Sequence, residues 1–217
     1  MTRTRRAVLR GGGLALLGGV AGCLSTSGGT TESTTGGAPT SADRVQSLPT
    51  PTLGPADAPV TVAVYEDYAC PHCRTYATTV FPKIRSTYVE SGVVRYEHHD
   101  FPIPVHDRWS WAAPNAARRV QDSLGDAAFF SLSQALYRHF DSYSLDTFGT
   151  LAADVGADPT AVRRAAAKRL YRPVILADRR AGRNRGVTGT PTVFVNGTPT
   201  ANYAWDTVRA AIEDARP

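Results

Sequence analysis

The sequence of 217 residues is poor in cysteine, has no long apolar stretch and repeats no segment. Three cysteines are too few for a small secreted domain held together by several disulfides. The apolar run from Gly11 to Gly22 has twelve residues, whereas a membrane-spanning helix needs about 20. A hydrophobic content of 42% is ordinary for a globular protein, so the composition indicates neither a fibre nor a membrane bundle.

The positive charge is concentrated at the N-terminus. The formal net charge is +5, but Arg3, Arg5, Arg6 and Arg10 precede any acidic residue. Without residues 1–22 the chain has 20 basic and 19 acidic residues. Because the rest of the chain is nearly neutral, we expect no nucleic-acid partner.

These arginines and the apolar run that follows them predict an export signal over residues 1–22. A charged segment followed by a short apolar segment is the pattern of a secretory signal. The stretch Thr4–Arg10 resembles the twin-arginine export motif, although Val8 stands where that motif has a bulkier residue. We therefore expect the protein to be exported.

Val20-Ala21-Gly22-Cys23 resembles a lipobox, which would make Cys23 the site of lipid attachment. The alternative is a signal peptide that merely contains a cysteine. From residue 25 to residue 41 the chain is almost entirely Ser, Thr and Gly, a composition that cannot form a core. Residues 23–50 are thus predicted to be a flexible tether, with a reach of roughly 25–30 Å, that holds a lipoprotein at the outer face of the cytoplasmic membrane.

If Cys23 carries lipid, Cys70 and Cys73 can pair only with each other. Closing so short a loop constrains little chain entropy, so the pair is a reactive dithiol or half of a metal site rather than a structural staple. Zinc would require two further ligands, and the candidates are His98, His99 and His106. They lie 25 or more residues beyond the dithiol and are not spaced as a second half-site. We expect no metal.

The dithiol falls at a predicted junction between a strand and a helix. Val60–Tyr65 is a β-branched run that predicts a buried strand. Pro71 stands where a helix begins, a position that tolerates its missing N–H, and residues 74–90 continue with apolar side chains at helical spacing. Pro82 inside this helix predicts a kink.

The remaining predicted elements come in the order strand, helical block, strand, strand, helix, at residues 93–98, about 108–185, 190–195, 198–203 and 205–215. The dipeptide Asn196-Gly197 is a strong hairpin signal between the third and fourth predicted strands. The sequence therefore predicts one α/β domain over residues 51–217.

The start of a helix favours a reactive thiolate at Cys70, through unpaired N–H groups and the positive end of the helix dipole. Cys73 lies one turn further into the helix, so we expect it to be less exposed and suited to resolving a mixed disulfide. His72 can hydrogen-bond or carry charge beside Cys70 and so favour the thiolate. Each pKa unit by which Cys70 lies below the ambient pH stabilises the reduced form by about 1.4 kcal/mol, or ~30 mV of oxidising power.

The motif Cys70–Cys73, read with Gly189–Thr192, resembles the DsbA-like thiol:disulfide oxidoreductases of the thioredoxin superfamily. The resemblance implies a thioredoxin-like fold, with a central mixed sheet and an inserted helical subdomain at about residues 108–185. It also implies a cis peptide bond before Pro191. Thr190 and Pro191 would then pack against the dithiol and present their backbone to a substrate strand.

One position departs from this pattern. Many thioredoxin-like proteins have a buried acid six residues before the first cysteine of the dithiol. In this chain the first cysteine of the dithiol is Cys70, and that position is Val64. The nearest carboxylates are Glu66 and Asp67. Either could serve as a proton relay, and the alternative is that they fix the loop or cap the helix.

The resemblance implies an enzyme that oxidises cysteine-containing secreted clients and needs no cofactor beyond its own Cys70–Cys73 disulfide. A quinone-linked membrane oxidase, DsbB-like or VKOR-like, would re-oxidise it. Two alternatives stay open: a disulfide reductase or isomerase, for example in cytochrome maturation, and a metal- or client-binding lipoprotein without turnover. The arginine-rich stretch 163–185 is either a solvated helix face or a surface for an acidic client or anionic lipid.

Overall fold

A computed structural model of the chain describes residues 39–103 and 105–217, which belong to one compact unit. The predicted export signal over residues 1–22, the residue Cys23 and the first part of the tether lie outside these ranges, so they stay predictions. Within the described ranges, no helix is both long and apolar enough to cross a membrane.

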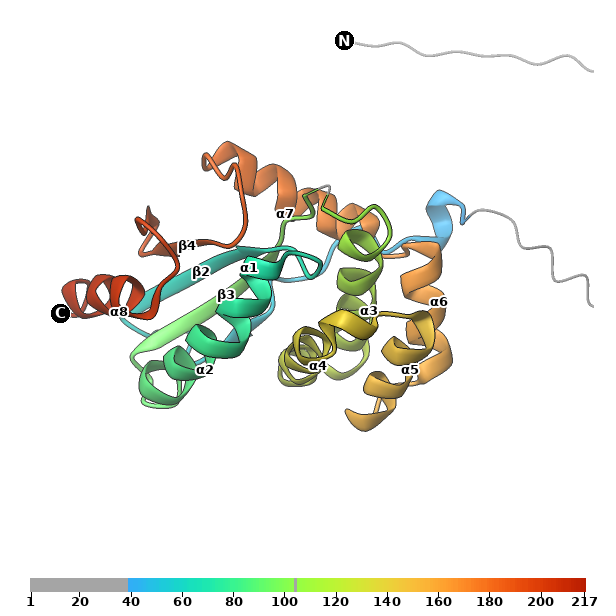
Figure 1. The fold of residues 1–217 in the computed structure, drawn as a ribbon, viewed down its shortest axis with the longest axis horizontal. Helices are drawn as coiled ribbons and strands as arrows, with labels where there is room; N and C mark the ends of the chain where they lie inside the picture. The colour runs from blue at the N-terminus through green and yellow to red at the C-terminus, as the bar shows by residue number, and fades with distance from the viewer. Residues whose placement is uncertain (1–38, 104) are drawn as a thin grey trace, which may run out of the picture. The chain divides into compact units, whose positions relative to one another are not determined.

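The core of the fold is a mixed sheet of five strands in the order β1-β3-β2-β4-β5 (Figure 1). The parallel pair β2 (Val60–Glu66) and β3 (Val94–Asp100) forms its centre. Antiparallel to these run β1 (Thr52–Leu53) beside β3 and β4 (Thr192–Val195) beside β2, while β5 (Thr198–Pro199) forms the other edge. The mixed sheet agrees with the predicted fold class. The sequence did not predict β1, because its two residues carry no periodic signal.

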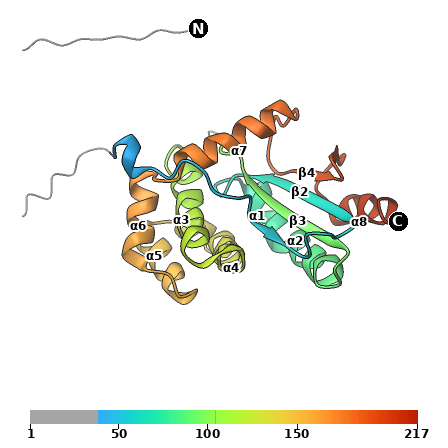
Figure 2. The ribbon, with the colours of Figure 1, turned by 180° about the vertical axis from the view of Figure 1, so that it is seen from behind.

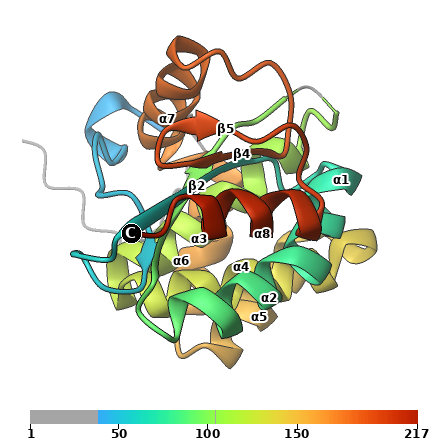
Figure 3. The ribbon, with the colours of Figure 1, turned by 90° about the vertical axis from the view of Figure 1, so that its left-hand side faces the viewer.

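Both faces of β2 are buried, which explains its uninterrupted apolar run. Val62 and Val64 face the main core, while Ala63 and Tyr65 belong to a second cluster on the opposite face. Helices cover each face, as Figure 3 shows by the positions of α7 and α8 on either side of the strands. The dithiol therefore follows a strand that is held from both sides.

The helix that follows the dithiol is interrupted by two π-helical turns. It consists of α1 (Pro71–Thr75), a π turn at Tyr76–Val80, α2 (Phe81–Ile84) and a second π turn at Arg85–Val89. The first π turn directly precedes the turn that contains Pro82, the residue at which the sequence predicts a kink. Because proline has no N–H to donate, a wider turn at this point accommodates the missing hydrogen bond.

Turn residues near Gly125, Ser142, Gly156 and Pro173 predict breaks in the inserted helical region, and the structure divides it into helices at these places. The elements are α3 (Trp109–Leu124), α4 (Asp126–Arg138), the 3-10 turn Phe140–Ser142, α5 (Leu145–Asp154), α6 (Pro159–Lys168) and α7 (Arg172–Asn184). Breaks fall where turn residues predict them. Gly125 separates α3 from α4 with a φ of 82°, and the Asp158 carboxylate caps α6 by accepting a hydrogen bond from the Thr160 N–H at 2.8 Å.

The last helix of this block, α7, packs on the sheet as well as on α3. It covers the face opposite α1 and α2, where the sheet contributes Tyr65 and Phe101. The other face carries α8 (Trp205–Asp214), whose Val208 and Ile212 enter the main core. The sheet thus has helices on both sides, and α7 belongs to its covering layer.

The packed domain begins before residue 51, where the sequence analysis places its start. After a 3-10 turn at Ser41–Asp43, Val45 and Leu48 pack against a buried cluster that includes Tyr171 and Ile175. The Val45 N–H donates to the carbonyl of Leu170 at 2.9 Å. The predicted tether therefore extends too far, because its last residues include apolar side chains that are buried against α6 and α7.

The hairpin predicted at Asn196-Gly197 is confirmed, with φ values of 44° and 82° at these two residues. Such positive values at both central positions suit a tight two-residue turn. Its second strand is shorter than the predicted 198–203. It ends at Pro199, and the Thr200 hydroxyl then closes a turn by donating to the carbonyl of Asn202 at 2.9 Å.

The contact between α7 and the sheet predicts the effect of one substitution. A Cβ at Gly182 would lie 2.8 Å from ring atoms of both Tyr65 and Phe101, too close to fit without displacing two buried rings. Gly182→Ala should lower the free energy of unfolding by about 1–3 kcal/mol, measured as a lower urea midpoint at unchanged slope.

The matched control is Gly149→Ala in α5, where the nearest atoms belong to the flexible side chain of Arg163. We expect this variant to be as stable as the parent, or more stable by up to ~1 kcal/mol from helix propensity. Equal losses at the two glycines would show that the packing of α7 on the sheet is not the cause.

Candidate active site

The dithiol lies at the carboxyl end of β2, on a short loop that Asp67 holds in place. The Asp67 carboxylate accepts hydrogen bonds from the N–H groups of Ala69 and Ile103, each at 2.8 Å. The Cys70 N–H donates to the Asp67 carbonyl at 3.0 Å. Cys70 is then the N-cap of α1 in an extended conformation, and Pro71 occupies the first turn as predicted.

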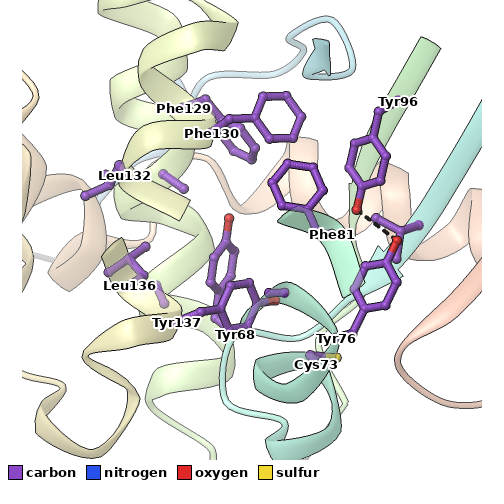
Figure 4. Close-up of a cluster of buried hydrophobic side chains, with 14 of the residues drawn as sticks. Tyr68, Cys73, Tyr76, Phe81, Tyr96, Phe129, Phe130, Leu132, Leu136 and Tyr137 are labelled. Atoms are coloured by element: carbon purple, nitrogen blue, oxygen red, sulfur yellow. Dashed lines mark hydrogen bonds between the residues drawn. The ribbon is translucent and has the colours of Figure 1, made fainter. Parts of the chain in front are cut away.

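Both cysteines are free thiols, and both are nearly covered. Cys70 is 3% exposed and Cys73 is fully buried. The Cys70 sulfur lies 3.4 Å from the carbonyl oxygen of Thr190, while the Asp67 N–H donates to the sulfur of Cys73 at 3.4 Å. Figure 4 shows Cys73 close to Tyr76 in the core beneath the site.

The two sulfurs have opposite electrostatic environments. The pKa of Cys70 is lowered to about 5, first by a hydrogen bond from the Cys73 thiol and further by Thr190 and the N–H groups of Cys73 and His72, against the effect of burial. Burial raises the pKa of Cys73 well above its ordinary value, and the hydrogen bond to Cys70 and the charge of Glu66 raise it further. At neutral pH the site therefore holds one thiolate, on Cys70, and one thiol.

The loop before β4 faces the dithiol from a distant part of the sequence. The peptide bond between Thr190 and Pro191 is cis, as the resemblance implies. The carbonyl of Thr190 contacts Cys70, and the Thr190 hydroxyl has no other hydrogen-bond partner among the described residues. That hydroxyl is thus available to donate to a thiolate.

Two contacts at the rim of the site were not predicted. The Nδ1 atom of His72 lies 2.9 Å from the hydroxyl of Tyr203, which fixes the exposed imidazole in one direction. The guanidinium of Arg74 pairs with Asp141 at 2.8 Å and lies over the ring of Phe140, which joins α1 to the helical insertion. No local pattern signals either contact, because the partners are far apart in sequence.

A chain of buried charges starts at Glu66, close to Cys73. One carboxylate oxygen of Glu66 lies 3.2 Å from His98 Nδ1, and His98 Nε2 lies 3.3 Å from Asp100. Arg118 donates to Asp100 at 2.6 Å and continues the chain to Asp178 on α7 at 2.5 Å. The sequence analysis treated His98 as a strand residue and did not identify this network.

The charges in this chain shift one another's pKa values. Burial raises the pKa of Glu66, although its hydrogen bond to His98 opposes the shift. Burial alone would lower the pKa of His98, but the hydrogen bonds to Asp100 and Glu66 outweigh it and raise that pKa to about 9. His98 is therefore a buried cation at neutral pH, paired with carboxylates on both sides.

Glu66 also borders a small cavity between β2 and α4. The cavity measures about 10 Å³, room for roughly one water molecule. Its lining includes Glu66 and Tyr137, both of which are buried. Val64 lies on the same face of β2 as Glu66, two residues earlier, and is fully buried in the core. The buried carboxyl in this chain therefore comes from a different position on that strand face.

The predicted zinc candidates do not meet. His98 is bound in the charge network, His99 stacks on Tyr65 with 4.6 Å between ring centres, and His106 caps the start of α3. Across residues 39–103 and 105–217, no group of three His, Cys, Asp or Glu side chains is arranged to hold a metal ion.

Comparisons with known proteins agree with this geometry. Residues 46–214 match the thioredoxin family. Disulfide bond formation protein D of Bacillus subtilis is 26% identical over 170 residues, which cover 75% of this chain and 75% of that protein. The crystal structure of oxidised BdbD from the same species has a TM-score of 0.71 at 26% identity, covering 80% of this chain and 98% of that one. Wolbachia pipientis alpha-DsbA1 shares the fold, with a TM-score of 0.66 at 23% identity over 81% of this chain and 96% of its own.

A dithiol at the start of a helix, facing a cis-proline loop on a mixed sheet, defines a thiol–disulfide exchange centre of the thioredoxin type. The chain belongs to the thioredoxin family. Within that family it is a DsbA-like thiol:disulfide oxidoreductase, and therefore an enzyme.

The low pKa of Cys70 predicts the pH dependence of its alkylation. In the reduced full chain carrying Cys23→Ser, the rate of reaction with iodoacetamide should rise with a midpoint near pH 5, because only the thiolate reacts. Cys73→Ala removes the largest stabilising contact, so it should move the midpoint to higher pH. A midpoint near that of a free thiol, ~8.5, in the Cys23→Ser protein would contradict the geometry.

Proposed function

We propose that this protein is a dithiol oxidase that introduces disulfides into exported, cysteine-containing proteins. The observation that carries the proposal is the contrast between the two sulfurs, a Cys70 thiolate with a pKa of about 5 and a buried Cys73 thiol. A thiolate that is stable at neutral pH stabilises the reduced enzyme, so the disulfide form is a strong acceptor of electrons. Disulfide formation also matches the name of the Bacillus subtilis relative, disulfide bond formation protein D.

The reaction is a pair of exchanges at Cys70. A client thiolate attacks the Cys70 sulfur of the oxidised enzyme, a mixed disulfide forms, and Cys73 leaves with the electron pair and takes up a proton. The thiolate of the client's second cysteine then attacks the sulfur of the client's first cysteine in the mixed disulfide. The client disulfide forms, and Cys70 leaves as a thiolate. Two electrons pass from the client to the enzyme, which ends reduced. The redox-active disulfide itself is the only cofactor the reaction requires.

Glu66 is the carboxyl best placed to give Cys73 its proton. It is buried, its negative charge acts on Cys73, and burial raises its pKa, which favours the protonated form that a proton donor needs. The cavity beside Glu66 has room for one water molecule that could link this carboxyl to Tyr137. Asp67 instead uses both carboxylate oxygens to hold the loop, so we assign it a positioning role.

His72 and the cis-proline loop complete the assignment. His72, held by Tyr203, orients a polar group beside the thiolate, and Thr190 with Pro191 forms the wall along which a client strand would lie. Pro71 lets α1 begin directly after Cys70, so that free N–H groups point toward the sulfur.

The location and the partners follow from the chemistry and the N-terminal sequence. A reduced enzyme needs an electron acceptor for the next turnover, and a quinone-linked membrane oxidase of the DsbB-like or VKOR-like type would supply one. Lipid on Cys23 would hold the domain at the outer face of the cytoplasmic membrane, near such a partner, and thereby raise its effective concentration. Exported proteins with unpaired cysteines would be the clients.

Trapping of mixed disulfides tests the direction of transfer. The full chain with Cys73→Ala, expressed in the native host, should accumulate mixed disulfides through Cys70 with exported proteins that contain at least two cysteines. The matched control, Cys70→Ala, should trap none, because Cys73 is buried and lipid on Cys23 would block the third sulfur. Disulfide formation in the trapped clients should fail when the gene is deleted. A reductase would be favoured if client disulfides formed normally in the deletion strain. It would also be favoured if the trapped partners already carried complete disulfides that need reduction.

Replacing Glu66 tests its role in proton transfer. Glu66→Gln keeps the shape of the side chain but cannot donate a carboxyl proton, so oxidation of a dithiol peptide should slow on the order of 100-fold. The alkylation midpoint of Cys70 should stay near pH 5.

The control is Asp67→Asn, which should lower the free energy of unfolding while leaving the rate per folded molecule close to that of the parent. A Glu66→Gln enzyme as fast as the parent would assign the proton to solvent, and a slow Asp67→Asn enzyme of normal stability would assign it to Asp67.

A further inference from the structure

The outer face of α7 carries arginines without carboxylate partners. We name as the arginine face a set of five side chains, four on α7 and one from the segment before β1: Arg172, Arg179, Arg180, Arg183 and Arg44. None of them has a carboxylate within ion-pair distance among residues 39–103 and 105–217. The acid on the same helix, Asp178, turns inward and pairs with Arg118.

Six other surface arginines of the described domain have carboxylate partners. Each of the following forms an ion pair with a carboxylate on its own helix, on its own strand or across a short gap: Arg74, Arg85, Arg95, Arg119, Arg209 and Arg216. Six further arginines have no carboxylate within ion-pair distance among residues 39–103 and 105–217: Arg108, Arg138, Arg163, Arg164, Arg169 and Arg185. The arginine face is therefore one cluster of unpaired positive charge on a domain that as a whole is close to neutral.

The arginine face is hollowed. Two neighbouring hollows of about 340 and 330 Å³ share Leu176 and Arg180 in their linings. Arg179 and Arg183 border the first, and Arg44 and Arg172 border the second. The Nε atoms of Arg44 and Arg179 are shielded from solvent without a hydrogen-bond partner among the described residues. Each hollow thus combines an apolar contact with donors suited to an anionic oxygen.

The charges of this face repel one another. The pKa of Arg179 is lowered by burial and by the neighbouring charge of Arg183. Keeping such charges together costs free energy in the isolated domain, and an anionic surface would relieve that cost.

The position of the face in the fold indicates its partner. The face lies on α7, which covers the other face of the sheet from the main core that contains the dithiol (Figure 3). The described chain begins at residue 39 close to α6 and α7, where the Val45 N–H donates to Leu170, as Figure 2 shows. The 38 preceding residues, which include the predicted lipid site at Cys23, therefore join the domain on this side.

We propose that the arginine face docks the domain on a membrane surface through the phosphate groups of anionic lipids. Docking through α7 would leave the opposite layer, with the dithiol helix, turned away from the membrane and toward clients. The inference rests on the proposed function in one respect. The membrane that the arginine face would bind is the membrane to which lipid on Cys23 would attach the chain. Each arginine near an anionic surface strengthens binding several-fold, so five together suffice for reversible attachment without lipid.

Vesicle binding tests the proposal. The protein is the chain from residue 23, the form that the predicted cleavage would leave, with Cys23→Ser so that no lipid contributes. We expect it to sediment with phosphatidylcholine vesicles that contain about a third phosphatidylglycerol, not with pure phosphatidylcholine, and to be released at high salt. Arg172→Glu/Arg180→Glu/Arg183→Glu should lower the partition coefficient on the order of 100-fold.

The matched control, Lys83→Glu/Arg138→Glu/Arg209→Glu, changes the net charge by the same amount at exposed positions away from α7, and should bind within about three-fold of the parent. If both triple variants lost vesicle binding equally, the binding would depend on net charge and not on the arginine face. Equal binding to the two kinds of vesicle would overturn the proposal, as would release by inorganic phosphate at constant ionic strength or capture by poly-glutamate in place of the vesicles.

The same preparations separate this proposal from the proposed function. Oxidation of a dithiol peptide in solution, without vesicles, should proceed at the parent rate in both triple variants, because the substituted residues lie away from the dithiol. Vesicle binding that is lost while activity is retained assigns the arginine face to the membrane. A parent protein that binds vesicles but oxidises no dithiol would overturn the proposed function and leave the docking surface intact.

Discussion

The hydrogen bond between the two cysteine sulfurs is the interaction on which the site depends. Because Cys73 is buried and keeps its proton, it can donate to Cys70, and the backbone N–H groups at the start of α1 add to this donation. The depressed pKa of Cys70 stabilises the folded, reduced protein fully above pH ~9, the pKa of an unperturbed thiol, and this contribution declines as the pH falls below ~9. This stabilisation is lost as the pH falls through about 5. The structure of the strand, loop and helix around the dithiol keeps this pair of sulfurs in place.

A second constraint comes from the buried charges beneath the site. A carboxylate in a core is costly unless it is paired, and Glu66 meets this requirement through His98, which is in turn paired with Asp100. Arg118, fully buried, completes the chain and anchors it to α7 through Asp178. The network thus connects the dithiol layer, the sheet and α7. It also provides a buried carboxyl although Val64 occupies the position where related proteins place one.

Local patterns in the sequence were sufficient to predict the parts of the fold that depend on neighbouring residues. The β-branched run of β2, the proline at the start of α1 and the Asn-Gly turn each depend on a few consecutive residues, and the cis peptide before Pro191 followed from a motif. The pair of Glu66 and His98 could not be predicted in this way. It requires the register of β2 against β3, in which Val64 lies beside His98 and Glu66 beside Asp100, and periodicity does not determine register. The contact between His72 and Tyr203 likewise depends on the tertiary fold.

The reduction potential of the Cys70–Cys73 pair tests the central claim most directly. Equilibration of the full chain carrying Cys23→Ser with glutathione buffers at pH 7 would give this value. A Cys70 pKa of about 5 lies roughly two units below that of thioredoxin's reactive cysteine, and each unit corresponds to ~30 mV. The account predicts a potential of about −210 mV or less negative, whereas a value near thioredoxin's, about −270 mV, would contradict it.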